Sequence, residues 1–326
     1  MNFQIKLLLL TFFVTLIFSL VIIPILRRLK VGQIERTDGP QSHLKKQGTP
    51  TMGGIIMIIG ITVISIAVSY YYYQKGNVEV AKKILPLMLT SIGFGIVGFV
   101  DDFKKLVLRN TTGLKPAYKM LGLLIISVIY IVYLTMGLKI GTDTYIPFLK
   151  EYIELPIWLY VPAAIFVMLA TTNAVNLTDG VDGLSTSVTT IIITCLTVIG
   201  IIFDVKEVIL LGCIVCGSNL AFLLFNLHPA KIMMGDTGSL LLGGVIASIA
   251  LYLKLPILLI IIAMIPVLET VSVILQIGYF KLTGKRLFKM APLHHHFELS
   301  GWNENKVVSV FSIVTLIFCV IGLNSI

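Results

Sequence analysis

Residues 84–105 read I-L-P-L-M-L-T-S-I-G-F-G-I-V-G-F-V-D-D-F-K-K. From Ile84 to Val100 this stretch has no charged side chain, and the pair Asp101 and Asp102 follows at once. An apolar run of about 20 residues crosses roughly 30 Å of hydrocarbon, at about 1.5 Å per residue. Carboxylates at the end of such a run are costly unless they are solvated or paired. The stretch therefore predicts a membrane-spanning helix with a polar site at its end.

The composition extends this prediction to the whole chain of 326 residues. Hydrophobic residues make up 57% of it and charged residues only 13%, against about 25% charged in an average soluble domain. No soluble core would bury that much apolar surface. We expect an all-α, polytopic integral membrane protein with a single transmembrane domain over residues 1–326. Ten transmembrane helices are predicted, at 4–26, 51–73, 84–100, 118–137, 157–175, 187–203, 207–225, 239–253, 255–280 and 307–325.

Two of the apolar runs have special features. The first, from Leu7 to Leu26, is long for a signal peptide and lacks a small-x-small cleavage site, so we expect it to be kept as the first span. The ninth is long and contains Pro266 and Glu269, which predicts a kink or break. All four cysteines lie inside apolar runs, which favours helix packing over a metal or redox role.

Charge is distributed unequally between the two sides that ten spans would define. The loops on one side, with the adjoining helix ends, carry most of the 25 Lys and Arg residues; they are 27–50, 101–117, 176–186, 226–238 and 281–306. The positive-inside rule places these loops in the cytoplasm and both termini outside. The net charge of +9 then reflects contact with an anionic lipid bilayer and suits an anionic substrate, so no nucleic acid partner is expected. The polar clusters of the chain fall in the same loops, which predicts an active site open to the cytoplasm.

The first two polar clusters lie in the N-terminal third of the chain. The segment K-K-Q-G-T-P-T-M-G-G at 45–54 offers cations, including Lys46, beside glycines that permit close backbone approach. Asp101 and Asp102 are followed by basic residues at Lys104, Lys105, Arg109, Lys115 and Lys119. Neighbouring residues on a helix point about 100° apart. One Asp is therefore free to face a site while the other contacts a supporting lysine.

The third cluster, N-A-V-N-L-T-D-G-V-D-G-L, occupies residues 173–184. Its amide and carboxylate side chains recur every three residues, at Asn173, Asn176, Asp179 and Asp182. A helix would align them on one side, whereas the glycine after each aspartate indicates a turn in the later part. The bidentate glutamate of a calcium loop is missing, which excludes an EF-hand. Such a density of polar groups beside a span indicates a binding site.

The fourth and fifth clusters lie in the last two loops of the same side. F-N-L-H-P-A-K-I-M-M-G-D-T-G-S at 225–239 places Asp236 just before a span, which Thr237 and Ser239 are expected to cap. Free N–H groups beside an aspartate suit a magnesium-bound phosphate. P-L-H-H-H-F-E at 292–298 holds three of the five histidines. Zinc ligands normally have helical or strand spacing, so phosphate binding or proton transfer is favoured for these histidines.

Together the clusters supply carboxylates for a divalent cation, lysines for phosphates, and histidines, all on one side of the membrane. Mg²⁺ prefers a few carboxylates together with substrate phosphates. The reaction class that needs this set at a membrane surface is phosphoryl transfer from a water-soluble diphosphate donor to a lipid phosphate.

The five clusters resemble the motifs of the polyprenyl-phosphate N-acetylhexosamine-1-phosphate transferases. The resemblance covers nearly the whole chain, in family order: G-T-P-T-M-G-G, the Asp pair, N-x-x-N-x-x-D-G-x-D-G-L, F-N-x-x-P-A-x-x-x-M-G-D-x-G-S and P-L-H-H-H-F-E. The first and last motifs favour the branch that transfers phospho-N-acetylmuramoyl-pentapeptide. The resemblance implies a Mg²⁺-dependent reaction of UDP-N-acetylmuramoyl-pentapeptide with undecaprenyl phosphate in the bacterial cytoplasmic membrane. The products would be lipid I and UMP, in the first membrane step of peptidoglycan synthesis.

The resemblance also implies catalytic roles. Asp236 would be the magnesium ligand, and Asp101 or Asp102 would deprotonate or orient the lipid phosphate. His294 would join these catalytic residues and, with its two neighbours, hold the diphosphate or ribose region. Two mechanisms stay open, direct attack by the lipid phosphate or a phospho-enzyme on an Asp. A bulky nucleophile delivered by the membrane favours direct attack.

Substrate binding is implied for a further set of residues. The nucleoside site would be lined by Asn176, Asp179, Gly180, Val181 and Asp182, with Asn173 added to the substrate-binding set. The diphosphate or ribose region would contact Asn226, His295 and His296, and the diphosphate would pair with Lys46 and Lys119. Where the family often has a phenylalanine that stacks on uracil, this chain has Met233, and a thioether contact would replace stacking.

Other functions are compatible with parts of the sequence. A sibling transferase that uses UDP-N-acetylglucosamine is the main alternative. A transporter would need polar residues deep in several spans, and Glu269 is the main residue of that kind. A homodimer through apolar helix faces is left open. A groove for the prenyl chain is expected near the broken ninth span.

Overall fold

The structure is a computed structural model that describes residues 2–29, 48–106 and 113–326; Lys46 and Arg109 lie outside these ranges. Within them, ten helices are long and apolar enough to cross a membrane, as predicted. They are α1 (Phe3–Arg28), α3 (Gly54–Gln74), α4 (Val78–Leu106), α5 (Pro116–Val132) with its π-helical extension η1 (Tyr133–Gly137), α6 (Ile157–Thr178), α7 (Leu184–Ile202), α8 (Lys206–Asn226), α9 (Gly235–Tyr252), α11 (Met264–Thr283) and α13 (Glu304–Asn324). Helix α4 is longer than predicted, so Asp101 and Asp102 lie inside its last turns rather than after it.

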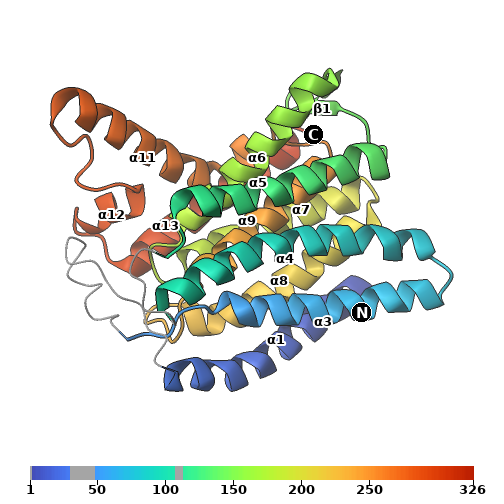
Figure 1. Cartoon of the computed structure of the whole chain (residues 1–326), viewed down its shortest axis with the longest axis horizontal. Coiled ribbons are helices and arrows are strands. Elements are labelled where there is room, and N and C mark those ends of the chain that lie inside the picture. Colours follow the sequence, from blue (N-terminus) through green and yellow to red (C-terminus); the bar gives the residue numbers. More distant parts are fainter. Residues whose placement is uncertain (1, 30–47, 107–112) are drawn as a thin grey trace.

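The ninth predicted span is divided into a short helix, α10 (Leu259–Ile262), and α11. The break is confirmed, but it lies at Ala263 (φ −102°, ψ 33°), N-terminal to Pro266. Pro266 falls in the first turn of α11, where a missing N–H costs no helical hydrogen bond. Helix α11 then projects away from the other helices (Figure 1).

Helix α9 forms the centre of the bundle, and its residues from Thr237 to Tyr252 are all buried. It packs mainly against α4 and α6. The crossing with α4 is close at Gly98, where an added Cβ would lie 2.1 Å from the backbone oxygen of Asp236. Only glycine permits this approach. As a result, the last turns of α4, which carry Asp101 and Asp102, lie beside the N-terminus of α9.

The segment between η1 and α6 forms a β-hairpin. Strands β1 (Asp143–Ile146) and β2 (Glu151–Glu154) are antiparallel. Tyr145 pairs with Tyr152 across the strands, with ring centroids 5.0 Å apart, and such aromatic pairs stabilise a short hairpin.

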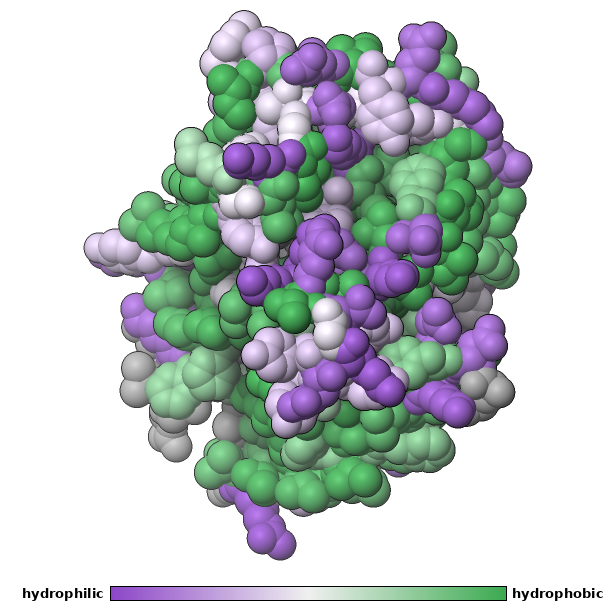
Figure 2. Space-filling view, turned by 90° about the vertical axis from the view of Figure 1, so that its right-hand side faces the viewer, coloured by the Kyte–Doolittle hydropathy of each residue, from purple (hydrophilic) through white to green (hydrophobic). Residues whose placement is uncertain are grey.

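The hairpin and both chain ends lie in the right half of Figure 1, whereas the short helix α12 (Leu293–Glu298) lies at the left. Figure 2 views the right-hand end, where hydrophilic residues gather across the middle of the face and hydrophobic residues flank them. The ends of α4, α5 and α9 that carry the predicted site residues lie toward the left of Figure 1.

Candidate active site

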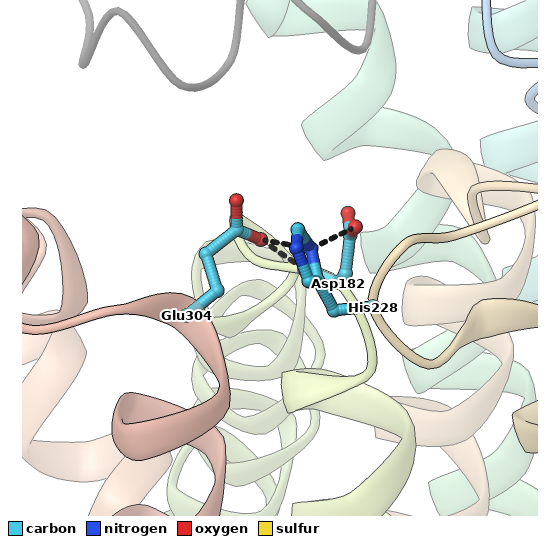
Figure 3. A group of neighbouring side chains, drawn as sticks. All are labelled: Asp182, His228 and Glu304. Carbon is cyan, nitrogen blue, oxygen red and sulfur yellow. Dashed lines mark hydrogen bonds and ion pairs between the residues drawn. The ribbon is translucent and has the colours of Figure 1, made fainter.

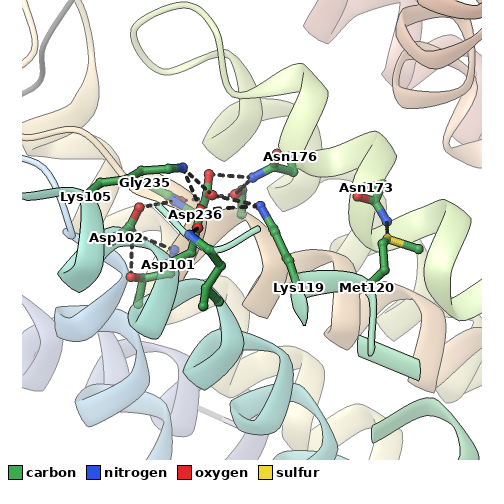
Figure 4. Close-up of polar contacts among 12 residues, drawn as sticks. Asp101, Asp102, Lys105, Lys119, Met120, Asn173, Asn176, Gly235 and Asp236 are labelled. Carbon is green, nitrogen blue, oxygen red and sulfur yellow. Dashed lines mark hydrogen bonds and ion pairs between the residues drawn. The ribbon is translucent and has the colours of Figure 1, made fainter. Parts of the chain in front are cut away.

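A cluster of charged side chains lies where the C-terminal end of α4 meets the N-terminal ends of α5 and α9 (Figure 4). Asp236 is at its centre. Its Oδ2 accepts hydrogen bonds from Lys105 Nζ at 3.0 Å and Lys119 Nζ at 2.8 Å. Its Oδ1 accepts one from Asn176 Nδ2 at 2.9 Å. The side chain is 19% exposed, so a ligand can reach this carboxylate.

Asp101 belongs to the same cluster. Its Oδ2 lies 2.5 Å from Lys105 Nζ and 3.8 Å from Lys119 Nζ. Its Oδ1 accepts a hydrogen bond from the backbone N–H of Leu114 at 2.7 Å. The Lys105 ammonium is therefore held between Asp101 and Asp236, and the cluster combines two carboxylates with two cations.

Asp102 has a different environment from its neighbour. It is buried, its Oδ1 accepts from the backbone N–H of Asp236 at 3.2 Å, and its Oδ2 accepts from the N–H and the hydroxyl of Thr237 at 2.9 and 2.6 Å. A carboxylate at this position satisfies N–H groups that the first turn of a helix leaves without partners. Asp102 therefore caps α9 from another helix.

This finding corrects the expectation for the start of α9. The helix begins at Gly235, and neither Thr237 nor Ser239 caps it. Thr237 donates its hydroxyl to Asp102, and Ser239 donates to the carbonyl of Gly235 at 3.0 Å. Ser239 also accepts from Asn176 Nδ2 at 2.9 Å, which links α6 to α9 beside the cluster.

The third sequence cluster is half helix and half turn, as the glycines indicated. Helix α6 ends at Thr178, and α7 begins after Gly183, which has a φ of 75°. Asn176 thus reaches the Asp236 cluster from the last turns of α6. Asn173 does not, because its Nδ2 donates to the carbonyl of Leu169 at 2.7 Å and lies beside Met120 (Figure 4).

His294 is buried in a contact with α11. Its backbone N–H and its Nδ1 both lie 3.2 Å from Oε1 of Glu269, the acid that the sequence singled out within the ninth span. The other ring nitrogen, Nε2, faces the turn after α6, where a Cβ on Gly180 would lie only 2.1 Å from it. Gly180 is therefore needed for His294 to pack against the predicted nucleoside loop, in which Val181 is also buried.

The other two histidines of α12 have separate partners. His295 Nδ1 lies 2.9 Å from Oε2 of Glu298, and His296 Nδ1 accepts the backbone N–H of Lys289 at 3.1 Å. Because the three Nδ1 atoms face three different partners, the cluster does not have the convergent geometry of a zinc site.

Asn226 and Met233 lie at the two ends of the loop between α8 and α9. The Asn226 side chain accepts from the hydroxyl of Thr186 at 2.6 Å and donates to the carbonyl of Ile232 at 3.0 Å. Met233 is 5% exposed, and its N–H donates to the carbonyl of Pro50 at 2.8 Å. Both residues brace this loop, and their contacts with substrate stay predictions.

Sequence reasoning missed the partners of Asp182. Its Oδ2 lies 3.0 Å from Nδ1 of His228, which also lies 3.5 Å from Oε2 of Glu304 (Figure 3). Among the described residues, this is the one group of three acids and histidines whose potential ligand atoms all lie within 4.8 Å of one another. His228 stands inside the fourth motif, but nothing in the sequence links it to Asp182 or to the start of α13.

The sequence of this chain is similar to those of known proteins. The family model described as glycosyl transferase family 4 matches residues 84–254, which include Asp101, Asp182 and Asp236. A curated relative from Clostridium kluyveri (strain ATCC 8527) is 49% identical over 317 residues, covering 97% of each chain. One from Clostridium botulinum (strain Alaska E43) is 48% identical over 315 residues, covering 97% of this chain and 94% of the relative. One from Acetivibrio thermocellus is 46% identical over 316 residues, covering 96% and 92%. All three relatives are named phospho-N-acetylmuramoyl-pentapeptide-transferase.

Proposed function

The chain belongs to the family of phospho-N-acetylmuramoyl-pentapeptide transferases, and on this premise we propose that it synthesises lipid I. The donor is UDP-N-acetylmuramoyl-pentapeptide, the acceptor is undecaprenyl phosphate, and the second product is UMP. The observation that carries the proposal is the cluster of Asp101, Asp236, Lys105 and Lys119 at one end of the helix bundle. Transfer of a phosphoryl group from a diphosphate to a lipid phosphate needs carboxylates and cations around the reacting phosphates. The cluster supplies both.

We place the cluster at the cytoplasmic face of the bacterial cytoplasmic membrane. The loops on this side carry most of the Lys and Arg residues, which favours a cytoplasmic location. The two chain ends lie toward the opposite end of the bundle (Figure 1). A water-soluble nucleotide donor would then reach the site directly from the cytoplasm.

The donor set of the cluster fits Mg²⁺. Oδ2 of Asp101 and Oδ2 of Asp236 lie 2.5 and 3.0 Å from the same Lys105 nitrogen, so the two oxygens already share a cation. Carboxylates that leave room for substrate phosphates are the ligands Mg²⁺ prefers in phosphoryl-transfer sites. Asp236 would hold the ion, which when bound would neutralise charge on the donor diphosphate.

The residues of the chain then have separate tasks in the reaction. An oxygen of the lipid phosphate attacks the sugar-linked phosphorus, the bond from that phosphorus to the UMP oxygen breaks, and UMP leaves. Asp101 accepts the proton when the lipid phosphate arrives protonated. Lys105 and Lys119 offset the negative charge of the phosphates. Asp101 is preferred to Asp102 as the base because its Oδ2 faces the two lysines of the cluster, whereas both oxygens of Asp102 accept hydrogen bonds from the start of α9.

Direct attack is the mechanism that we prefer over a phospho-enzyme, since the membrane delivers the nucleophile to the site. Incubation of the protein with radiolabelled donor in the absence of lipid tests this choice. Isolation of a covalent phospho-N-acetylmuramoyl-pentapeptide adduct on the enzyme would overturn it.

An apolar cavity is available for the prenyl chain. It has a volume of about 480 Å³ and lies between α6 and the broken ninth span, lined among others by Ala164, Phe166, Ile260, Val267 and Ile274. Several of its lining residues are exposed, among them Phe166, Ile260 and Ile274, so the cavity is open to the lipid phase. We propose that it holds part of the undecaprenyl chain. A homodimer through apolar helix faces stays a prediction from the sequence.

A donor comparison tests the proposed function. Purified protein in detergent is given undecaprenyl phosphate, Mg²⁺ and either UDP-N-acetylmuramoyl-pentapeptide or UDP-N-acetylglucosamine, and UMP release is measured. We expect release from the pentapeptide donor only. Release from UDP-N-acetylglucosamine alone would assign the sibling activity, and release from neither would refute a transferase of this kind.

A further inference from the structure

We propose that Glu304 and His228 are positioning residues that hold Asp182 in the donor-nucleotide site. This inference rests on the proposed function, in which Asp182 lines the nucleoside site. The three residues come from elements far apart in the chain (Figure 3). Asp182 lies in the turn between α6 and α7, His228 in the loop between α8 and α9, and Glu304 is the first residue of α13.

The Asp182 carboxylate is held by two donors from one loop. Its Oδ2 accepts from His228 Nδ1 and from the backbone N–H of Ala230, both at 3.0 Å. Since the contacts of Nδ1 are both carboxylate oxygens, this nitrogen carries the proton and donates. A carboxylate bonded by an imidazole and a backbone N–H is fixed in position and in rotation.

Glu304 braces the same group from the other side. Its Oε2 lies 3.5 Å from His228 Nδ1 and accepts the backbone N–H of Asp182 at 3.4 Å. One oxygen thus touches both the side chain that holds Asp182 and the Asp182 backbone. Both side chains are buried, with Glu304 6% and Asp182 2% exposed. We assign Glu304 a positioning role because its Oε2 contacts His228 and the backbone of Asp182.

The two supports are themselves fixed. The start of α13 is capped by Asn303, whose Oδ1 accepts from the backbone N–H of Lys306 at 2.8 Å. The loop that carries His228 is closed by the backbone bond from Lys231 to Phe225 at 2.7 Å. Movement of Asp182 would therefore require one of these local structures to open.

The position of Asp182, His228 and Glu304 predicts which kinetic constant these residues affect. The group holds the turn 179–183, whereas the Asp236 carboxylate contacts side chains of α4, α5 and α6, namely Lys105, Lys119 and Asn176. Loosening the turn should weaken binding of the nucleotide and leave the chemical step in place. The Michaelis constant for the donor should rise, while kcat and the constant for undecaprenyl phosphate stay nearly unchanged.

Two isosteric replacements of His228 provide the test. The amide nitrogen of Asn stands where Nδ1 of His stands, whereas the amide of Gln reaches the position of Nε2. We expect His228→Asn to keep the donor KM within about threefold and His228→Gln to raise it about tenfold, the value of one charge-assisted hydrogen bond. Glu304→Ala should raise the donor KM about as much as His228→Gln does. Glu304→Gln keeps an acceptor oxygen and should raise the donor KM less than Glu304→Ala. Lys231→Gln, an exposed change in the same loop, is the control and should match wild type.

Binding of UMP, measured by calorimetry on the same purified variants, separates this inference from the proposed function. If wild type releases no UMP from the pentapeptide donor, the proposed function fails. The inference still stands if wild type binds UMP and His228→Gln weakens that binding while His228→Asn does not. Equal donor KM or equal UMP affinity in the Asn and Gln variants would overturn the inference, as would a change confined to kcat or the absence of UMP binding by wild type. A stoichiometric transition metal in wild type that is lost in His228→Gln would also overturn it, by making the group a metal site.

Discussion

Asp101 and Asp102 are adjacent, yet replacing each with asparagine should have different consequences. Asp102 accepts three hydrogen bonds at the start of α9, from the N–H of Asp236 and from the N–H and hydroxyl of Thr237. Asparagine offers one acceptor oxygen, and its NH₂ group would face one of these donors. We therefore expect Asp102→Asn mainly to lower the stability of the fold.

The magnitude follows from the bonds that change. A hydrogen bond to a charged group contributes about 1.5–3 kcal/mol, and loss of a helix cap costs about 0.5–2 kcal/mol. Since asparagine keeps part of the interaction, we expect a loss of about 2–3 kcal/mol in the free energy of unfolding. Because this chain is longer than the roughly 150–250 residues for which the shift is about 2–4 °C per kcal/mol, we take about 2 °C per kcal/mol. The midpoint of thermal unfolding in detergent should then fall by about 4–6 °C.

Asp101→Asn should instead abolish turnover with a smaller effect on stability, because Lys105 keeps its contact with Asp236 and the asparagine oxygen can still accept from Leu114. Loss of a general base lowers rates by about 10²–10⁴-fold, and the midpoint should stay within about 2 °C of wild type. Both variants are measured by intrinsic fluorescence during heating and by UMP release. Thr237→Val removes one of the three donors and should show part of the Asp102→Asn loss, with the double variant less than additive. An Asp102→Asn protein that unfolds at the wild-type temperature would refute the capping role.

Three further variants test the rest of the site. Asp236→Asn should abolish UMP release and remove its dependence on Mg²⁺ concentration; near-normal activity would exclude Asp236 as the metal ligand. Lys105→Met should lower kcat at least tenfold, by loss of a contact with both carboxylates, while Lys104→Met should stay near wild type in the same assay. Gly180→Ala should raise the donor KM, because the added Cβ would meet His294 at 2.1 Å; an unchanged KM would separate His294 from the nucleoside loop.

The spans and their break were predictable because the membrane imposes a simple rule. Each helix must satisfy its own backbone and present about 20 apolar residues, and this pattern is local in the sequence. Pro266 and Glu269 are exceptions to this apolar helical pattern, and they therefore predicted a kink or break in the ninth span. The break itself lies at Ala263, which no residue type signals, because Pro266 is accommodated in the first turn of the new helix.

That some of the polar residues singled out by the sequence would lie together was also predictable, but the contacts that each of them makes were not. Asp101, Asn176 and Asp236 meet as expected. Which aspartate of the pair faces the lysines depends on the rotation of α4 about its axis. That rotation is set by the close crossing at Gly98, a contact between residues far apart in sequence. The capping expectation for Thr237 was wrong for the same reason, since the cap comes from α4 and not from the local sequence.

Glu304 shows where local rules stop. An acid in the first turn of α13 is favoured by the helix dipole, and that rule would accept Asp as readily as Glu. The contacts with His228 and with the backbone of Asp182 also require a side chain as long as that of Glu, which the helix dipole does not. A sequence pattern can explain why an acid stands at this position. Only the packing of α13 against the turn after α6 explains why its carboxylate oxygen ends beside the nucleoside loop, and this is why the positioning group could be found in the structure and not in the sequence.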